Sequence, residues 1–263
     1  QLVQNEIIEL TSNKNIDYFS YDLSLISENK LLGNEIINKY PCLDILINNV
    51  GALFIKQETT KEGLEKTFAL NHIGPFTLTL ELLDLLNKSK GARIVNVSSA
   101  AHYNVVDTTI KKENNRTFIE RKFFRTNFNI EDLESKNNYK GAHQYSRTKL
   151  MNILFTYKLA NDYLINKNIT ANCLHPGFVA SKFGHNNMGF FKLFLKFGQK
   201  IQAISVQKGA KASTFLALSE SVKNINGKYF DEDCSQKQSS SISYDKNLQN
   251  ILWQKSEEFR IDF

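Results

Sequence analysis

Strand-length apolar runs alternate with longer amphipathic segments along most of this chain. The runs are rich in isoleucine, valine, leucine or aromatic residues and end in polar or turn residues, at 16–23, 43–50, 92–99, 169–176 and, shorter, 227–231. Segments with helical spacing follow the first four, at 24–39, 59–88, 141–167 and 207–221. Strand followed by helix, repeated, is typical of a parallel sheet with helices on both faces. We therefore predict an α/β fold with a doubly wound parallel sheet, as one domain over 1–263.

Composition excludes several classes of protein. The chain has 263 residues, 41% of them hydrophobic, and a formal charge of +6 without a long block of like charge. A sizeable core is expected, and a nucleic-acid partner is not. The cysteines Cys42, Cys173 and Cys234 are far apart and show no metal-ligand spacing. We interpret them as reduced thiols in an intracellular protein. No apolar run reaches the 18 residues of a membrane-spanning helix.

Parallel sheets place their ligands outside the carboxyl ends of the strands. Polar or turn residues at those ends are therefore the first candidates for function. They are Asp22, Asn48, Asn49, Ser98, Ser99, His175, Pro176 and Gly177.

Two Tyr-x-x-x-Lys pairs lie on one predicted helix, Tyr145 with Lys149 and Tyr163 with Lys167. The tyrosines are 18 residues apart, five turns of helix, so they share a face but lie about 27 Å apart along the axis. A helix that follows a strand starts at the ligand-binding edge. We therefore place Tyr145 at that edge and interpret the second pair as a surface pair at the opposite edge.

Five motifs occur along the chain in a familiar order: "NNVG" (48–51), "LNHIG" (70–74), "RIVNVSS" (93–99), "YSRTK" (145–149) and "LHPGFVAS" (174–181). Together they resemble the short-chain dehydrogenase/reductase family, whose fold is Rossmann-like. The long gap between Ser99 and Tyr145, with an insertion at 102–140, resembles the retinol-dehydrogenase-like branch.

The resemblance implies a catalytic tetrad of Asn71, Ser99, Tyr145 and Lys149. Tyr145 would be the general acid/base, with its pKa brought toward the working pH by the charge of Lys149, aided by the positive nicotinamide. Ser99 would hold the substrate oxygen, and Asn71 would keep a water beside Lys149. Asn71 has an alternative interpretation, a polar residue that breaks the helix pattern before Gly74.

The resemblance also implies a dinucleotide site. NADP(H) is the tendency of the branch, and NAD is not excluded. Asp22 would contact the adenine amino group, or else cap the helix that starts near Ser24. Val50 stands where the family usually has alanine. The residues implied at the cofactor are Asp22, Leu23, Asn49, Val50, Gly51, Tyr145, Lys149, Pro176, Gly177, Val179 and Ser181. His102, three residues after Ser99, could line the substrate entrance.

The family's first two strands and its glycine-rich turn are absent from this sequence. No two of the 12 glycines lie closer than five residues, so no phosphate-binding spacing can be formed. We expect residues 1–15 to be helical and the chain to be a fragment that lacks some tens of N-terminal residues. Its central strands should show an unpaired edge, and by itself it should bind dinucleotide poorly.

Residues 182–206 correspond to the family's substrate lid, and 188–201 predict a basic amphipathic helix with several phenylalanines. Such a lid suits a lipophilic alcohol or carbonyl, such as a retinoid, steroid or fatty aldehyde. We expect the lid to pack either on its own domain or against a membrane surface. The protein would accordingly lie in the cytoplasm or at the membrane surface of the endoplasmic reticulum. The family often forms homodimers through the Tyr145 helix. We predict an oxidoreductase, and the alternative is a degenerate member that binds partners without turnover.

Overall fold

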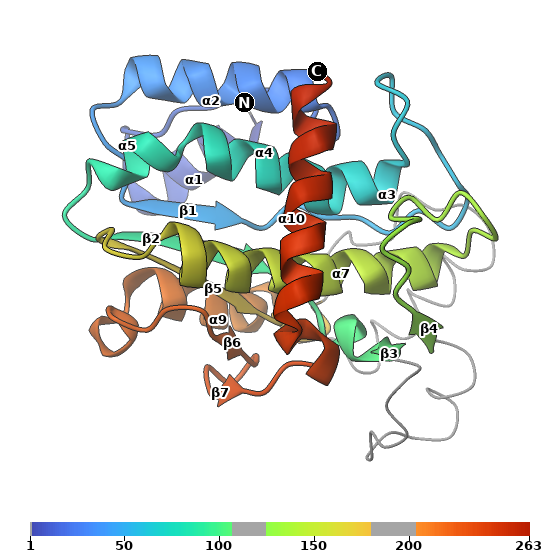
Figure 1. Cartoon of the computed structure of the whole chain (residues 1–263). Coiled ribbons are helices and arrows are strands. Elements are labelled where there is room, and N and C mark those ends of the chain that lie inside the picture. The colour runs from blue at the N-terminus through green and yellow to red at the C-terminus, as the bar shows by residue number, and fades with distance from the viewer. Residues whose placement is uncertain (1, 107–124, 180–203) are drawn as a thin grey trace.

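A mostly parallel sheet forms the centre of the molecule (Figure 1). The computed structural model describes residues 2–106, 125–179 and 204–263. Within them a five-stranded sheet has the order β1-β2-β5-β6-β7, and β7 is antiparallel to its neighbour. The strands are β1 (Ile45–Asn48), β2 (Ala92–Val97), β5 (Ile169–Leu174), β6 (Tyr229–Phe230) and β7 (Gln236–Lys237). The predicted parallel α/β fold is confirmed.

Successive side chains of β2 enter two different cores, as the pleat requires. Ile94 packs with Leu85 and Phe155 on the face covered by α2 (Ile26–Lys39), α4 (Gly74–Glu81), α5 (Leu83–Asn87) and α7 (Gly141–Lys158). Val95 packs with Leu216 on the opposite face, which α9 (Val206–Leu218) covers. All six residues of β2 are buried. The strand is therefore covered on both faces, which is typical of a parallel sheet, and its sequence is mostly apolar.

The segment 16–23 is not a strand in this structure, so that prediction was wrong. Phe19, Tyr21 and Leu23 pack against the core of α2 and α4 as the apolar pattern suggested. A strand also needs a neighbour for its backbone hydrogen bonds, and among the described residues β1 pairs with β2 alone. The expected unpaired edge is therefore confirmed at β1, where Ile47 is 43% exposed.

The long helix predicted at 59–88 is interrupted. It begins at α3 (Lys66–Phe68), passes through a π-helical turn η1 (Ala69–Ile73) and continues as α4 and α5. The π turn inserts an extra residue into the helix and carries Asn71 at its centre. Such turns often occur at functional sites because they re-aim one side chain.

The helix predicted at 141–167 is present as α7 and a π-helical extension η3 (Leu159–Tyr163). The helix α10 (Lys246–Ile261), for which we made no prediction, crosses α7 on its outer side (Figure 1). The N-terminal helix α1 (Leu2–Thr11) is present as expected. The short elements are η2 (Ala100–Asn104), β3 (Val105–Val106), β4 (Thr126–Asn127), η4 (Glu220–Val222) and η5 (Ser241–Tyr244).

The two predicted loops are described to different extents: residues 102–106 and 125–140 of the insertion are described, and of the lid only its last three residues. Within the 102–140 insertion, the short strands β3 and β4 pair with each other. The lid at 182–206, including the amphipathic segment 188–201, lies outside the described residues except at its last three positions. Among the helices that are described, none is both long and apolar enough to cross a membrane.

Candidate active site

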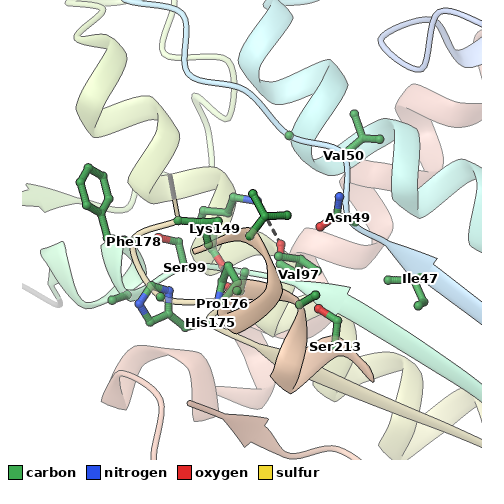
Figure 2. Close-up of a pocket in the computed structure, with 18 of the residues that line it drawn as sticks. Ile47, Asn49, Val50, Val97, Ser99, Lys149, His175, Pro176, Phe178 and Ser213 are labelled. Atoms are coloured by element: carbon green, nitrogen blue, oxygen red, sulfur yellow. Dashed lines mark hydrogen bonds between the residues drawn. The ribbon is translucent and has the colours of Figure 1, made fainter. Parts of the chain in front are cut away.

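A cavity of about 1030 Å³ opens at the carboxyl ends of β1, β2 and β5. Figure 2 shows Ser99, Lys149 and His175 on one side of it and Asn49 and Val50 on the other. Nine of the thirteen residues predicted for the tetrad and the cofactor line this cavity: Asn49, Val50, Gly51, Ser99, Tyr145, Lys149, Pro176, Gly177 and Val179. Three others, Asn71, Asp22 and Leu23, do not line it. Ser181 lies outside the described residues.

The helix α7 begins at this edge of the sheet and brings Tyr145 and Lys149 into the cavity (Figure 1). The two side chains are four residues apart and so lie on one face of the helix. The Nζ atom of Lys149 donates to the carbonyl oxygen of Val97 at 3.0 Å and lies 5.6 Å from the centre of the Tyr145 ring. This lysine is 3% exposed. Gly141, at the start of α7, has no room for a side chain, because a Cβ there would lie 2.2 Å from the carbonyl oxygen of Phe54.

The serines at the end of β2 point in different directions. Ser98 is buried, and its hydroxyl donates to the backbone carbonyl of Lys149 at 2.7 Å. Ser99 instead forms a hydrogen bond with the Tyr145 side chain. The choice of Ser99 over Ser98 as the residue beside Tyr145 agrees with this arrangement.

Asn71 lies behind the cavity wall and braces it. It is fully buried, its Oδ1 accepts from the Ala52 amide at 2.8 Å, and its Nδ2 donates to the Ala52 carbonyl at 2.9 Å and to Thr148 Oγ1 at 3.0 Å. Both hydrogens of the amide are therefore used. The Asn71 side chain ties the loop after β1 to α7, one residue from Lys149.

Gly51 lies between these groups. A Cβ atom at this position would be 3.1 Å from Lys149 Nζ and 3.2 Å from Asn71 Oδ1. Such contacts are closer than side chains normally allow, so the loop passes the lysine as closely as it does because residue 51 has no side chain. Val50, by contrast, is 51% exposed at the cavity rim, and its extra bulk over alanine meets no crowding.

Burial dominates the electrostatics of the site. It raises the pKa of Tyr145 to about 12, although the hydrogen bond with Ser99 lowers it in part. Burial also lowers the pKa of Lys149 to about 8. The sequence had suggested that Lys149 brings the phenol toward neutral pH. In this geometry the pKa of Tyr145 moves the other way, because burial shields the phenol from water and disfavours its charged form.

The turn after β5 forms the next wall of the cavity. Gly177 has φ +81°, and a Cβ there would meet Glu232 and Ile204, so only glycine fits this turn. His175 lines the cavity, and its Nδ1 atom is buried without a hydrogen-bond partner among the described residues. Burial lowers the pKa of His175, the charge of Asp231 raises it, and that of Lys149 lowers it.

We did not predict the wall that α9 contributes to the cavity. Its small residues face the cavity: Gly209, Ala210, Ser213 and Thr214, together with Val206 at the start of the helix. Gly209 lets α9 approach Val179, since a Cβ there would lie 2.4 Å from a Val179 methyl carbon. The signal that could have identified this wall is the small side chains at positions i, i+1, i+4 and i+5 of an otherwise amphipathic helix.

Two candidates near the strand ends have local structural roles. Asp22 accepts from the Ser24 amide at 3.0 Å and from its hydroxyl at 2.7 Å, in the turn before α2. These bonds lower the pKa of Asp22. The N-cap position of α2 is Leu25, so Asp22 is not the cap. His102 is completely buried and does not line the cavity.

The second Tyr/Lys pair belongs to the far end of the helix, as the topology predicted. Tyr163 lies in η3 and stacks on Trp253 of α10, with ring centres 3.9 Å apart. Tyr163 is 40% exposed and lines no part of the cavity.

Comparison with known proteins agrees with this fold. Residues 2–109 match the family model described as short chain dehydrogenase. Retinol dehydrogenase 14 of Mus musculus is 33% identical over 250 residues, which cover 90% of this chain and 64% of that protein. Retinol dehydrogenase 12 of the same species is 32% identical over 249 residues, which cover 95% of this chain and 71% of that protein.

Solved structures share the fold. The NADPH-bound carbonyl reductase from chicken fatty liver superposes with a TM-score of 0.59 over 89% of this chain and 82% of that chain, at 18% identity. The parallel sheet and the cavity at its carboxyl edge define an α/β protein with a Rossmann-like fold. The chain belongs to the short-chain dehydrogenase family and is similar to its retinol dehydrogenases, and it spans less than two thirds of the first of the two relatives above.

Proposed function

We propose that this protein is an oxidoreductase that transfers a hydride between NADP(H) and a lipophilic alcohol or carbonyl. The observation that carries the proposal is the meeting of Ser99, Tyr145 and Lys149 in one cavity, from three positions that span 50 residues of sequence. The relatives named as retinol dehydrogenases support the substrate class, and the NADPH of the carbonyl reductase supports the cofactor.

The residues that line the cavity fit the nicotinamide half of a dinucleotide. The loop at Asn49–Gly51 and the turn at Pro176–Val179 face each other across the cavity, and the unpartnered Nδ1 atom of His175 offers a polar contact. When bound, the dinucleotide supplies the hydride, which no side chain can do. We assign its nicotinamide end to the neighbourhood of Tyr145, Lys149, Pro176 and Val179.

Proton transfer to the substrate is carried out by side chains of the protein. Because burial raises the pKa of Tyr145 to about 12, the phenol is protonated at neutral pH and stands ready to donate to a carbonyl oxygen. Ser99 holds the same oxygen by a second hydrogen bond as charge develops on it. Lys149 places a positive charge over the phenol ring and favours the phenolate that remains.

Asn71 acts in this scheme through the backbone. Its clamp on Ala52 fixes the loop that passes Lys149, and its contact with Thr148 fixes the helix beside that lysine. We retain Asn71 in the catalytic group as a residue that keeps the proton path in place.

The substrate and cofactor classes can be tested together. Reduction of all-trans-retinal and of acetaldehyde is followed by nicotinamide absorbance, once with NADPH and once with NADH. We expect NADPH to be consumed with retinal and much less with acetaldehyde. Equal rates with both aldehydes would reject the lipophilic substrate class. No consumption under any condition would favour the alternative, a binding protein without turnover.

A further inference from the structure

The backbone carbonyl of Ser99 is held by two hydrogen bonds from one residue. The amide of His102 donates to it at 3.1 Å, and the ring Nδ1 of His102 lies 2.6 Å from it. The backbone of Ser99 is extended, with φ −164° and ψ 153°. The side chain branches from this same backbone. The position of that carbonyl therefore sets the direction in which the Ser99 hydroxyl points.

The second ring nitrogen of His102 determines its tautomer. The backbone amide of Ser240 donates to His102 Nε2 at 3.2 Å. A backbone amide can only donate and a backbone carbonyl can only accept. Both bonds can form at once in one state alone, the neutral ring with its proton on Nδ1, donating to Ser99.

The ring has no freedom to turn away from these partners. His102 is completely buried, and its ring centre lies 3.8 Å from that of Tyr103 and 4.9 Å from that of Tyr229. Rotation of the ring would break both hydrogen bonds and the aromatic contacts together.

The anchor at Ser240 is itself fixed to the helix that carries Tyr145. The hydroxyl of Ser243 donates to the Ser240 carbonyl at 2.7 Å, and Ser239 shares a hydrogen bond of 2.6 Å with Ser243. Ser239 also lies 2.7 Å from the hydroxyl of Tyr157. Tyr157 is on α7, 12 residues after Tyr145 and about 18 Å further along the axis.

We propose that His102 is a positioning residue, which uses the C-terminal turn at 239–243 as an anchor to hold Ser99 against Tyr145. Its catalytic consequence rests on the proposed function, since Ser99 must hold the substrate oxygen for its position to matter. The residue that the sequence suggested for the substrate entrance thus acts from inside the core.

Two substitutions separate the two bonds of His102. Asparagine carries a donor nitrogen as many bonds from the backbone as Nδ1, so His102→Asn keeps the bond to Ser99 and loses that to Ser240. Glutamine reaches the position of Nε2 with an acceptor oxygen, so His102→Gln keeps Ser240 and loses Ser99. Ser256→Ala is the matched control, because it removes a buried hydrogen bond of 2.8 Å to His72 that has no connection to Ser99.

The first readout is steady-state reduction of all-trans-retinal with NADPH at pH 7. We expect kcat of His102→Gln to fall tenfold or more, by about the effect of a small misplacement of a catalytic group, with KM changed less than threefold. His102→Asn should recover most of kcat, and Ser256→Ala should keep it. Equal loss in the Asn and Gln variants, or no loss in either, would overturn the proposal.

The second readout needs no turnover. The Ala101 amide donates to Ser99 Oγ at 3.2 Å, so its hydrogen exchange reports the position of that hydroxyl. Exchange at Ala101 should quicken in His102→Gln, and exchange at Ser240 should quicken in His102→Asn. If the wild-type protein does not reduce retinal, the proposed function is rejected. The exchange pattern of the His102 variants can still be measured in that case. Unchanged exchange at Ala101 in His102→Gln would reject the positioning role.

Discussion

The ammonium of Lys149 lies 5.6 Å from the centre of the Tyr145 ring, one helical turn away. At that distance a cation is attracted to the face of an aromatic ring. The ammonium of Lys149, however, donates its hydrogen bond to the carbonyl of Val97. The end of the strand therefore holds the lysine while it faces the tyrosine. The pair is thereby set in place by β2 as well as by α7.

The burial of Lys149 has a measurable effect on stability. Burial lowers the pKa of Lys149 to about 8 from the 10.5 of free lysine, so between these values the unfolded chain binds more protons than the folded one. Stability should therefore rise with pH in this window. Below pH 8 the buried charge opposes folding by about 3 kcal/mol, less about 1 kcal/mol for the hydrogen bond to Val97.

We expect Lys149→Met to be more stable than wild type at pH 7, with a free energy of unfolding about 2 kcal/mol higher. This is the cost of the buried charge less the contribution of the hydrogen bond to Val97. The gap should narrow as the pH rises from about 8 to about 10.5, the window set by the pKa of this lysine. Urea denaturation of both proteins across this range provides the measurement, and other titrating groups cancel in the difference. A constant gap would show that Lys149 titrates normally.

The Asn71 clamp predicts a joint loss of stability and function. Asn71→Ala leaves the half-buried Ala52 amide and carbonyl without these partners, which should lower the free energy of unfolding by about 1–3 kcal/mol. NADPH affinity should fall as well, because the loop at Gly51 loses its brace. Urea denaturation and fluorescence titration with NADPH measure the two effects.

Asn172→Ala is the matched control for this variant. Asn172 is also a buried amide that clamps backbone, donating to the Ile225 carbonyl at 2.6 Å and accepting from the Lys228 amide at 3.0 Å. It should lose comparable stability while NADPH affinity remains. Equal loss of affinity in both variants would show that Asn71 has no special connection to the cofactor.

A single methyl group at Gly51 tests the close approach of the loop. In Gly51→Ala the new Cβ would press on Lys149 Nζ and Asn71 Oδ1, and both can yield by a few tenths of an ångström. We expect the unfolding free energy to change by less than about 1 kcal/mol, while turnover falls about tenfold or more through misplacement of the lysine. Wild-type turnover with retinal and NADPH would contradict this.

Some of this structure could be predicted because local pattern determined it. The strands at 45–48, 92–97 and 169–174 follow from mostly apolar runs of strand length. The same reasoning failed at 16–23, because apolar alternation does not tell whether a neighbouring strand is available for pairing. The π turn around Asn71 was not predicted, since a single π turn is too short to show a periodicity of its own.

The site was predictable where family motifs coincide with strand ends, as at Ser99 and Tyr145. The environment of His102 was not, because its partner Ser240 is 138 residues away in sequence. The cavity wall on α9 was missed because small residues on a helix usually indicate close packing. The pKa of Tyr145 went opposite to expectation because burial depends on the whole tertiary structure.

The central claim is that Tyr145 exchanges the proton. Tyr145→Phe removes the phenolic hydroxyl and keeps the ring, and Tyr163→Phe is the matched control, since phenylalanine keeps the stack on Trp253. We predict that kcat for retinal reduction with NADPH falls by about 10²–10⁴-fold in Tyr145→Phe, with NADPH affinity within a few fold of wild type, and stays unchanged in Tyr163→Phe. Wild-type kcat in Tyr145→Phe would contradict the account.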